Sequence, residues 1–251
     1  MTMTLFISVV NHHHDDLIAD NSTLSSLAKK HKVIIKSNTQ PTEKLICYCK
    51  DNNISLITSR EIKGFGANNN EVFEFAQTHL GMADEDYFLV LNPDVDISQK
   101  SLESLLNKAQ TQSADISAIN LFKDKEYSIP DNSIRYYPKL LAPLKSLVGI
   151  KRTDRHDKSL IKQPIKIDWA AGSFLLFTTK CFKELNGFDE KFFMYFEDAD
   201  ICTRANKNGF NVWFFPAIKA IHYASHQNRK VFSKHFIWYW MSSVRYQVKN
   251  I

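Results

Sequence analysis

Three carboxylates follow a run of apolar residues in the second half of the chain. The run spans residues 192–196, and Glu197, Asp198 and Asp200 come directly after it. Because burying a carboxylate is costly unless the group is paired or used, acids in this setting are candidates for proton transfer. We expect Asp198 to begin a helix, whose N-terminus would stabilise its charge. The alternative is an ordinary helix start with acids in its first turn, and Arg204 is spaced at i, i+4 to form a structural ion pair with Asp200.

A second acidic cluster, with the sequence Asn92-Pro93-Asp94-Val95-Asp96, ends an apolar segment at 87–91 that predicts a strand. Ligands of open α/β sheets bind beyond the carboxyl ends of the strands. Closely spaced carboxylates at such a position can hold a divalent ion, which in turn holds a diphosphate. The alternative is a proline turn whose acids are solvated.

A turn with two glycines, Gly64-Phe65-Gly66, opens a predicted helix at 68–80. Backbone amides in such a turn can approach a phosphate or a sugar. The segment is not a P-loop, because the Gly-Lys-Ser/Thr ending is missing. An ordinary turn is the alternative.

Histidines occur in two groups. His12, His13 and His14 follow the first predicted strand, where a polar loop is the simplest interpretation. His222 and His226 are predicted on a loop after a strand at 212–215. They are either ordinary loop residues or part of a metal or phosphate site.

The composition limits the class of protein. The 251 residues are 44% hydrophobic and carry a net charge of +5, which is too small to indicate nucleic-acid binding and suits anionic phosphates or an anionic membrane. The four cysteines form no CxxC pair, so we expect free thiols in a reducing compartment. We find no signal-peptide pattern and no apolar run near the roughly 20 residues of a membrane span. The prediction is a cytoplasmic protein, with peripheral membrane contact left open.

The apolar pattern predicts an α/β fold with a mixed, mainly parallel sheet flanked by helices. A strand at 5–10, a helix at 15–30 and a strand at 32–36 form a βαβ unit. The segment 45–49 fits either a helix or a strand. The stretch 123–163 is polar and interrupted by prolines, which indicates a long excursion. The other expected strands are 54–58, 87–91, 174–178 and 212–215, and the other expected helices are 98–109, 180–185 and 198–207.

The last predicted element is an amphipathic helix over 232–249. A basic amphipathic helix with aromatic residues can lie in a membrane interface, and such a helix can equally pack on a domain core. We therefore divide the chain into a domain at 1–228 and a C-terminal helix at 229–251, with both roles open. The apolar stripe of the predicted helix consists of Phe232, Phe236, Trp240 and Val244. Ile237 and Tyr239 broaden this stripe, and basic residues surround it.

Together, these segments resemble the family 2 glycosyltransferases with the Rossmann-like GT-A fold. The similarity runs from about residue 5 to about residue 249, and it is strongest to O-antigen rhamnosyltransferases that act on polyprenyl diphosphate-linked N-acetylglucosamine. The segments that carry it are LFISVVNHH, GFGANNN, DYFLVLNPDVDIS, DWAAGSFLLFTTKCFKELNGFDEKFFMYFEDADICTRANKNGF and AIHYASHQNRKVFSKHF.

The resemblance implies roles for individual residues. Asp198 matches the catalytic base, with Glu197 beside it. Asp94 matches the metal-binding acid of a DxD-type motif, and His222 matches a histidine that approaches the metal or the diphosphate. Trp169 and Gly172 match the segment that lines the acceptor side. The positions implied to bind the donor are Asn11, Ser37, Asn38, Gly64, Gly66, Asn69, Asn92 and Asp94.

The chain departs from the family pattern at two places. Asn92 stands where the family has the first acid of the DxD-type motif, so Asp96 is a further candidate metal ligand. Ser37, followed by Asn38, stands where the family has an acid that reads the nucleotide base, which leaves the nucleotide less defined. The implied chemistry is an inverting transfer assisted by Mg²⁺ or Mn²⁺, in which one carboxylate takes the acceptor proton and the ion neutralises the departing diphosphate.

The resemblance implies dTDP-L-rhamnose as the donor and a polyprenyl diphosphate-linked sugar as the acceptor. The product would enter O-antigen or another surface polysaccharide, with the enzyme on the cytoplasmic face of the inner membrane. One alternative is transfer of galactose or galactofuranose from UDP. Another is a protein that binds a sugar nucleotide at a degenerate site, which Asn92 and Ser37 favour.

Overall fold

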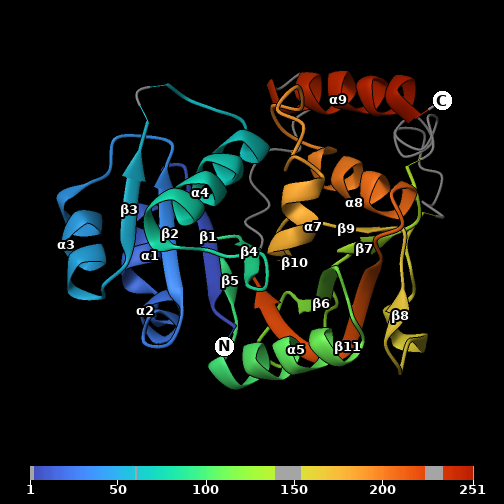
Figure 1. Ribbon diagram of the computed structural model, residues 1–251, viewed down its shortest axis with the longest axis horizontal. Helices are drawn as coiled ribbons and strands as arrows, with labels where there is room; N and C mark the ends of the chain where they lie inside the picture. The colour runs from blue at the N-terminus through green and yellow to red at the C-terminus, as the bar shows by residue number, and fades with distance from the viewer. Residues whose placement is uncertain (1–2, 60, 139–153, 224–233, 251) are drawn as a thin grey trace.

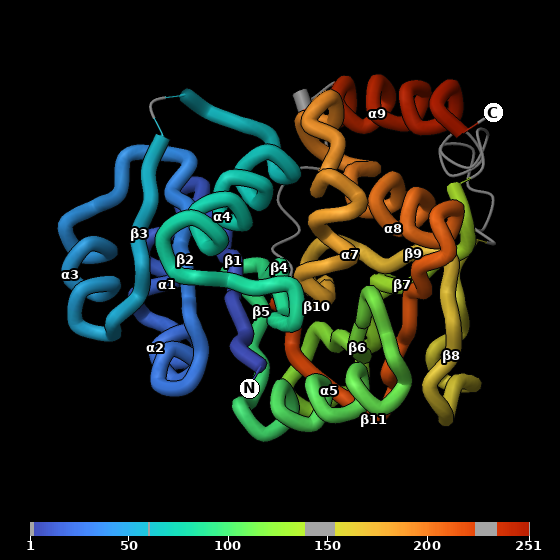
Figure 2. The backbone as a smooth tube through the Cα atoms, viewed as in Figure 1, coloured from blue at the N-terminus to red at the C-terminus, as the bar shows by residue number. Residues whose placement is uncertain are grey.

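The fold is a central mixed sheet with helices on both faces (Figures 1 and 2). The computed structural model describes residues 3–59, 61–138, 154–223 and 234–250. In the view of Figure 1 the elements before residue 80 form the left side, and the later helices α7, α8 and α9 lie at the upper right. The prediction of an α/β fold with helices flanking a mainly parallel sheet is confirmed.

Within the described residues, nine strands form the main sheet, in the order β3-β2-β1-β4-β10-β6-β11-β5, with β8 beside β11. The pairs β1–β2, β1–β4, β2–β3 and β6–β11 are parallel, whereas β10, β5 and β8 run antiparallel to their neighbours. The strands are β1 (Leu5–Asn11), β2 (Lys32–Ser37), β3 (Ser55–Thr58), β4 (Tyr87–Leu91), β5 (Val95–Asp96), β6 (Ile116–Phe122), β8 (Ile165–Lys166), β10 (Phe174–Thr178) and β11 (Val212–His222). A separate two-stranded sheet pairs β7 (Ile134–Arg135) with β9 (Trp169–Ala170).

Helices cover both faces of the sheet because the strands carry apolar side chains on both sides. In β1, for example, Phe6 belongs to one core cluster, and Leu5 and Ile7 belong to the other. The first cluster lies under α4 (Phe65–Leu80), α7 (Thr179–Glu184), α8 (Glu197–Lys207) and α9 (Lys234–Asn250). The second lies under α1 (Asp15–Asp20), α2 (Ser22–Ala28), α3 (Glu43–Asp51) and α5 (Gln99–Thr111). A short 3₁₀ turn, η1, spans Lys158–Leu160.

The single helix predicted at 15–30 is wrong, because the structure has two helices there. Asn21 has an extended backbone, and its side chain accepts a hydrogen bond from the Thr23 amide, so it ends α1 and caps α2. The ambiguous segment at 45–49 lies within α3, whose N-terminus is capped by Thr42. The helix predicted at 98–109 is α5, and Ser98 caps its N-terminus.

β6, which is fully buried in the middle of the sheet, was not predicted from the sequence. The strand predicted at 212–215 is longer than expected, because β11 continues to His222 past an irregularity between Phe215 and Lys219. His222 therefore ends a strand and does not lie on a loop. His226 lies outside the described residues.

All four cysteines are free thiols, as expected, and three of them are buried. In the described part of the chain, no helix is both long and apolar enough to cross a bilayer.

Candidate active site

Several predicted donor residues gather where β1 and β2 end. The Asn11 amide donates to Ser37 Oγ at 2.8 Å and to Asp15 Oδ1 at 2.7 Å, which ties the two strand ends to α1. Because β1 pairs with β2 on one side and with β4 on the other, this edge is the point where the strand order reverses. Crevices for ligands form at such switch points in α/β sheets.

The Gly64 turn is fixed from two directions. On one side, Asn38 exchanges hydrogen bonds with the backbone of Lys63 at 2.8 and 2.9 Å. On the other, the Phe65 amide donates to the Phe193 carbonyl at 3.0 Å. A Cβ on Gly64 would overlap that carbonyl oxygen, so only glycine fits at this position. The turn that opens α4 is thereby joined to the segment that precedes the acids of α8.

Two other predicted donor residues take structural positions. Asn69 is fully buried, and its side chain bonds the Ser8 hydroxyl and the Phe65 carbonyl, which holds α4 on β1. Gly66 packs against Phe188 and lies beside Glu197, since a Cβ there would be 3.8 Å from the Glu197 Cβ. The donor roles of both residues stay predictions.

Asp198 is held in the first turn of α8 by backbone amides. Its Oδ2 accepts from the Gly172 amide at 3.0 Å and its Oδ1 from the Ala199 amide at 2.7 Å. Burial raises the pKa of Asp198 above its usual value, while these hydrogen bonds and the positive charge of Arg135 act in the opposite direction. The residue as a whole is partly exposed.

Glu197, its neighbour, lies in a different environment. Its side chain is 6% exposed, and Oε2 has no hydrogen-bond partner among the described residues. Burial, followed by the charge of Asp198, raises the pKa of Glu197 well above its usual value. Two adjacent buried carboxyls cannot both ionise cheaply. We therefore assign the negative charge to Asp198, which has the donors, and the neutral form to Glu197.

The backbone before these acids is strained. Tyr195 and Phe196 have φ values of 70° and 68°, in the left-handed region that bulky residues avoid. Packing against α9 stabilises the segment, because Phe196 contacts the ring of Tyr239 at 5.3 Å and that of Tyr246 at 5.7 Å between centroids. Such strain persists where surrounding structure over-determines it, and it is common at functional sites.

The predicted ion pair is present behind the acids. Arg204 Nε is 2.7 Å from Asp200 Oδ2, and the guanidinium also donates to the carbonyls of Leu185 and Gly187. Asp200 is fully buried and also lies 2.7 Å from Lys249 Nζ. Of the three acids, Asp200 therefore has the structural role that the sequence predicted.

His222 lies between two carboxylates at the end of β11. Its Nδ1 is 2.7 Å from Asp131 Oδ2, and its Nε2 is 3.5 Å from Asp94 Oδ1. Burial disfavours the charged imidazole, but the two carboxylates outweigh burial and raise the pKa of His222 to about 9. Burial also acts to raise the pKa of Asp131, yet the hydrogen bond from His222 holds it below its usual value.

The third predicted metal ligand lies apart from this pair. Asp96 Oδ1 accepts a hydrogen bond of 2.5 Å from the Thr23 hydroxyl, which ties β5 to α2. The structure thus brings Asp94 and His222 together, whereas Asp96 contacts Thr23, and its role as a metal ligand stays a prediction. Among the described residues, no three His, Cys, Asp or Glu side chains gather into a metal cage.

The predicted acceptor segment supports Asp198 from the side. Gly172 contributes the amide described above, and a Cβ on it would lie 3.0 Å from the ring of Phe65. Trp169 is buried, with its indole nitrogen bonded to the Tyr136 carbonyl and its ring 5.3 Å from the Arg135 guanidinium. Its role toward an acceptor stays a prediction.

Comparison with known proteins relates this geometry to a family. The chain is 35% identical over 251 residues to the rhamnosyltransferase WbbL of Escherichia coli (strain K12), which covers 98% of this chain and 93% of that protein. The chain belongs to the family of GT-A glycosyltransferases that contains the bacterial rhamnosyltransferases. It is also 28% identical to the N-acetylglucosaminyl-diphospho-decaprenol L-rhamnosyltransferase of Mycobacterium tuberculosis (strain H37Rv), over 69% of this chain and 60% of that protein.

Two further comparisons agree with the assignment. A family model described as the N-terminal domain of galactosyltransferase matches residues 158–228. Among solved structures, GalNAc-T7 with UDP, GalNAc and Mn²⁺ matches with a TM-score of 0.68 and 13% identity, over 97% of this chain and 47% of that one. TarS of S. aureus in complex with UDP-GlcNAc matches with a TM-score of 0.59 and 14% identity, over 94% of this chain and 61% of that one. These likenesses confirm the GT-A fold.

The structure adds three residues that sequence reasoning did not select for this glycosyltransferase. Asp131 orients His222, Arg135 contributes positive charge near Asp198, and buried Lys158 donates to the Ser133 hydroxyl at 2.8 Å. All three lie in the polar stretch at 123–163. The strand at 134–135 is too short to be predicted from the sequence. Only the fold brings these side chains to the strand ends.

Proposed function

We propose that this glycosyltransferase moves L-rhamnose from dTDP-L-rhamnose onto a polyprenyl diphosphate-linked N-acetylglucosamine, with inversion at the anomeric carbon. The observation that carries the proposal is the unequal pair of acids at the start of α8, set in a chain that is 35% identical to a rhamnosyltransferase. The name of the mycobacterial relative, a rhamnosyltransferase for a diphosphate-linked N-acetylglucosamine, supports the acceptor. We place the product in O-antigen or a related surface polysaccharide.

Asp198 acts as the general base in this proposal. Its carboxylate takes the proton of the acceptor hydroxyl while the hydroxyl oxygen bonds to the anomeric carbon of the donor. The bond from that carbon to the nucleoside diphosphate breaks, and its electron pair leaves with the diphosphate. A base with a pKa raised toward neutrality suits this step, because it is both ionised and able to hold the proton. Glu197, neutral and sealed, keeps the negative charge on Asp198.

The residues that would hold a divalent ion are Asp94 and His222. A carboxylate oxygen and an imidazole nitrogen that face each other fit Mn²⁺, and the carboxylate fits Mg²⁺. With only two protein ligands in place, donor diphosphate oxygens and water would complete the coordination. When bound, the ion supplies positive charge that offsets the charge of the leaving diphosphate. Mn²⁺ in the GalNAc-T7 structure supports such an ion for the fold.

A donor panel tests the proposal. Purified protein is incubated with dTDP-L-rhamnose, UDP-galactose or UDP-galactofuranose and a synthetic lipid diphosphate N-acetylglucosamine, with Mn²⁺ present. We expect product with dTDP-L-rhamnose. The anomeric configuration of the transferred sugar, α or β, should be opposite to that in the donor. Transfer from a UDP-sugar alone would replace the donor assignment. Nucleotide binding without transfer of any sugar would instead indicate a binding protein.

The role of Asp198 has a matched control in its neighbour. Asp198→Asn keeps the size and removes the proton acceptor, so we expect turnover to fall by about 10²–10⁴-fold with donor binding retained. Glu197→Gln replaces a neutral acid by a neutral amide and should retain most of the turnover. The reverse result, with Glu197→Gln the more damaging change, would move the base to Glu197.

A further inference from the structure

The helix α9 is oriented unlike an ordinary surface helix. Its inner face includes Ser242, Ser243 and Tyr246, all of which are buried. The Ser242 hydroxyl donates to the Met194 carbonyl at 2.9 Å, and the Tyr246 hydroxyl lies 2.8 Å from that of Thr203. A helix that packs on a soluble core normally places its aliphatic residues inward. Here, small and polar groups take much of the inner face.

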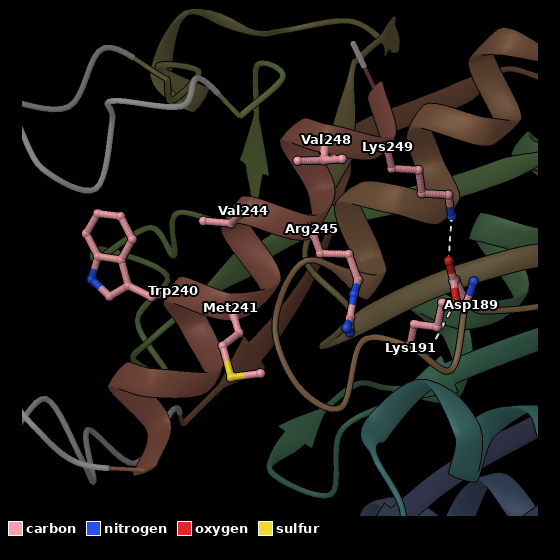
Figure 3. A pocket seen from close by; sticks show the side chains of 8 residues that line it. All are labelled: Asp189, Lys191, Trp240, Met241, Val244, Arg245, Val248 and Lys249. Carbon is pink, nitrogen blue, oxygen red and sulfur yellow. Dashed lines mark hydrogen bonds and ion pairs between the residues drawn. The ribbon is translucent and has the colours of Figure 1, made fainter.

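The aliphatic residues of α9 face outward. Ile237, Met241, Val244 and Val248 are 53%, 58%, 48% and 70% exposed, and their spacing of four, three and four residues aligns them in one stripe. We call these four residues the outer stripe. Trp240 stands beside it, and a shallow groove of about 750 Å³ runs along the helix between this side and Lys191 (Figure 3). The stripe differs from the sequence prediction, because Tyr239 packs inward on Phe196, and Phe232 lies outside the described residues.

The charge around the outer stripe is positive. Arg245 and Lys191 line the groove and are exposed, while the acid that also lines it, Asp189, is paired with Lys249 at 2.7 Å. The sequence contains no Asp or Glu after Asp200, so every charged side chain of α9 is basic. An apolar stripe beside basic groups matches the interface of an anionic bilayer, where acyl chains lie next to acidic headgroups.

The inner face of α9 contacts residues 193–196, which come directly before the acids of α8. Trp238 packs on Phe193 with ring centroids 4.8 Å apart, and His235 Nδ1 is 3.1 Å from the Tyr195 hydroxyl. One helix therefore separates the outer stripe from residues 193–196, and a helix with its side chains is about 10 Å across. In Figure 1, α9 forms the outer edge of the molecule above α8.

We propose that the outer stripe of α9 docks on an anionic lipid bilayer. Ile237, Met241, Val244 and Val248 enter the interface, with Lys191 and Arg245 at headgroup level. Docking places the acids of α8 about one helix diameter from the membrane surface. The use of this position for capturing a lipid-linked acceptor rests on the proposed function, whereas the docking itself does not.

A second copy of the chain is the other occupant to consider for this stripe. Two α9 helices packed through it would bring Arg245 and Lys191 of one copy close to those of the other, with no acid of α9 to offset them. Like charges brought together at an interface oppose association. An anionic bilayer supplies the opposite charge, so the observations favour lipid.

Vesicle co-sedimentation tests the proposal. The full chain is mixed with vesicles of phosphatidylcholine containing phosphatidylglycerol, or with phosphatidylcholine alone, at low and high salt. We expect binding to the anionic vesicles that weakens with salt. The double variant Met241→Glu/Val248→Glu should reduce the partition coefficient by at least about tenfold, since two aliphatic side chains no longer enter the interface.

A matched control places the same charge elsewhere. Leu160 is 77% exposed on η1, and Leu160→Glu should leave vesicle binding unchanged. Circular dichroism and thermal unfolding confirm that each variant is folded. No binding of the folded wild type to anionic vesicles would overturn the proposal. A dimer in sedimentation velocity that Met241→Glu/Val248→Glu disperses, without vesicle binding, would assign the stripe to a second copy and overturn it as well.

A soluble acceptor separates docking from catalysis. The double variant should keep its turnover with a short-chain lipid diphosphate acceptor in solution and lose it with a long-chain acceptor in vesicles. Failure of all rhamnosyl transfer by wild-type protein that still binds vesicles would contradict the proposed function and leave the docking surface in place. Equal loss of turnover with both acceptors would show that the substitutions disturb the acids of α8, and would contradict a role in acceptor capture.

Discussion

The stability of the protein should depend on pH through His222. The pKa of this imidazole is raised from 6.5 to about 9 in the fold, and each pKa unit corresponds to 1.36 kcal/mol. The pKa difference of 2.5 units, multiplied by this energy per unit, gives about 3 kcal/mol of stabilisation by the two carboxylates. A raised pKa means that the folded state binds the proton more tightly than the unfolded chain. The stabilisation is therefore complete below pH 6.5 and is lost as the pH rises through about 9.

The titration of nearby Lys158 changes the stability in the opposite direction, and its effect must be separated from that of His222. Burial lowers the pKa of Lys158 to about 8, against 10.5 for a free lysine, with Asp131 acting in the other direction. The unfolded chain therefore holds this proton more tightly, and stability from Lys158 rises between about pH 8 and 10.5. The wild-type profile alone mixes both effects. The difference between wild type and His222→Gln isolates the histidine, because Lys158 is present in both proteins.

Urea unfolding in EDTA from pH 6 to pH 10 measures this difference. We expect His222→Gln to be less stable than wild type by about 3 kcal/mol at pH 6 and nearly equal to it at pH 10. His79→Gln removes an exposed imidazole from the end of α4 and serves as the control. Asp131→Asn should lower the pKa of His222 in an NMR titration of the imidazole protons. Parallel wild-type and His222→Gln profiles over the whole range would refute the assignment of a charged His222 between two carboxylates.

Two further predictions concern the turn and the metal. Gly64→Ala should abolish transfer and cost about 1–3 kcal/mol of stability, because its Cβ meets a backbone carbonyl. Gly172→Ala should cost less, because its closest contact is the edge of the Phe65 ring at 3.0 Å and the Asp198 Cβ is 3.7 Å away. Equal losses in urea unfolding would show that the backbone at Gly64 can move. Mn²⁺ affinity, measured by calorimetry in the presence of nucleoside diphosphate, should increase from pH 7 to pH 9, because the ion and a proton compete for His222. Asp94→Ala should weaken this affinity. An affinity that changes neither with pH nor with Asp94→Ala would place the ion elsewhere.

Local patterns in the sequence were enough to predict the candidate acids and much of the sheet. The acids at 197, 198 and 200 were conspicuous because they follow five apolar residues, and the i, i+4 spacing of Asp200 and Arg204 sufficed to predict their ion pair. The strands at 5–11, 32–37, 87–91 and 174–178 have apolar runs of ordinary length, so most of the sheet was predictable. The family resemblance then supplied the fold.

What local patterns could not supply is the outcome of long-range packing. Asp131 is 91 positions from His222, and no periodicity connects them. β6 mixes small and polar residues, such as Ser117 and Asn120, with its apolar ones, so it lacks the uniform run that marked the other central strands. Asp94 and Asp96 look equivalent in the sequence, yet only the fold places Thr23 next to one of them and His222 next to the other.

The unequal acids at the start of α8 suit the proposed role of Asp198 as a base directly after an apolar run of residues. In the proposed mechanism, Asp198 holds the proton after transfer, so both carboxyls are neutral and the site is inactive until Asp198 loses the proton. Glu197 is a poor acceptor for it, because burial favours the neutral form of its carboxyl. Asp198 is a partly exposed residue that accepts hydrogen bonds from two amides, which favour its charged form, so we expect it to release the proton to water. In this mechanism, the buried Glu197 therefore leaves the negative charge on Asp198.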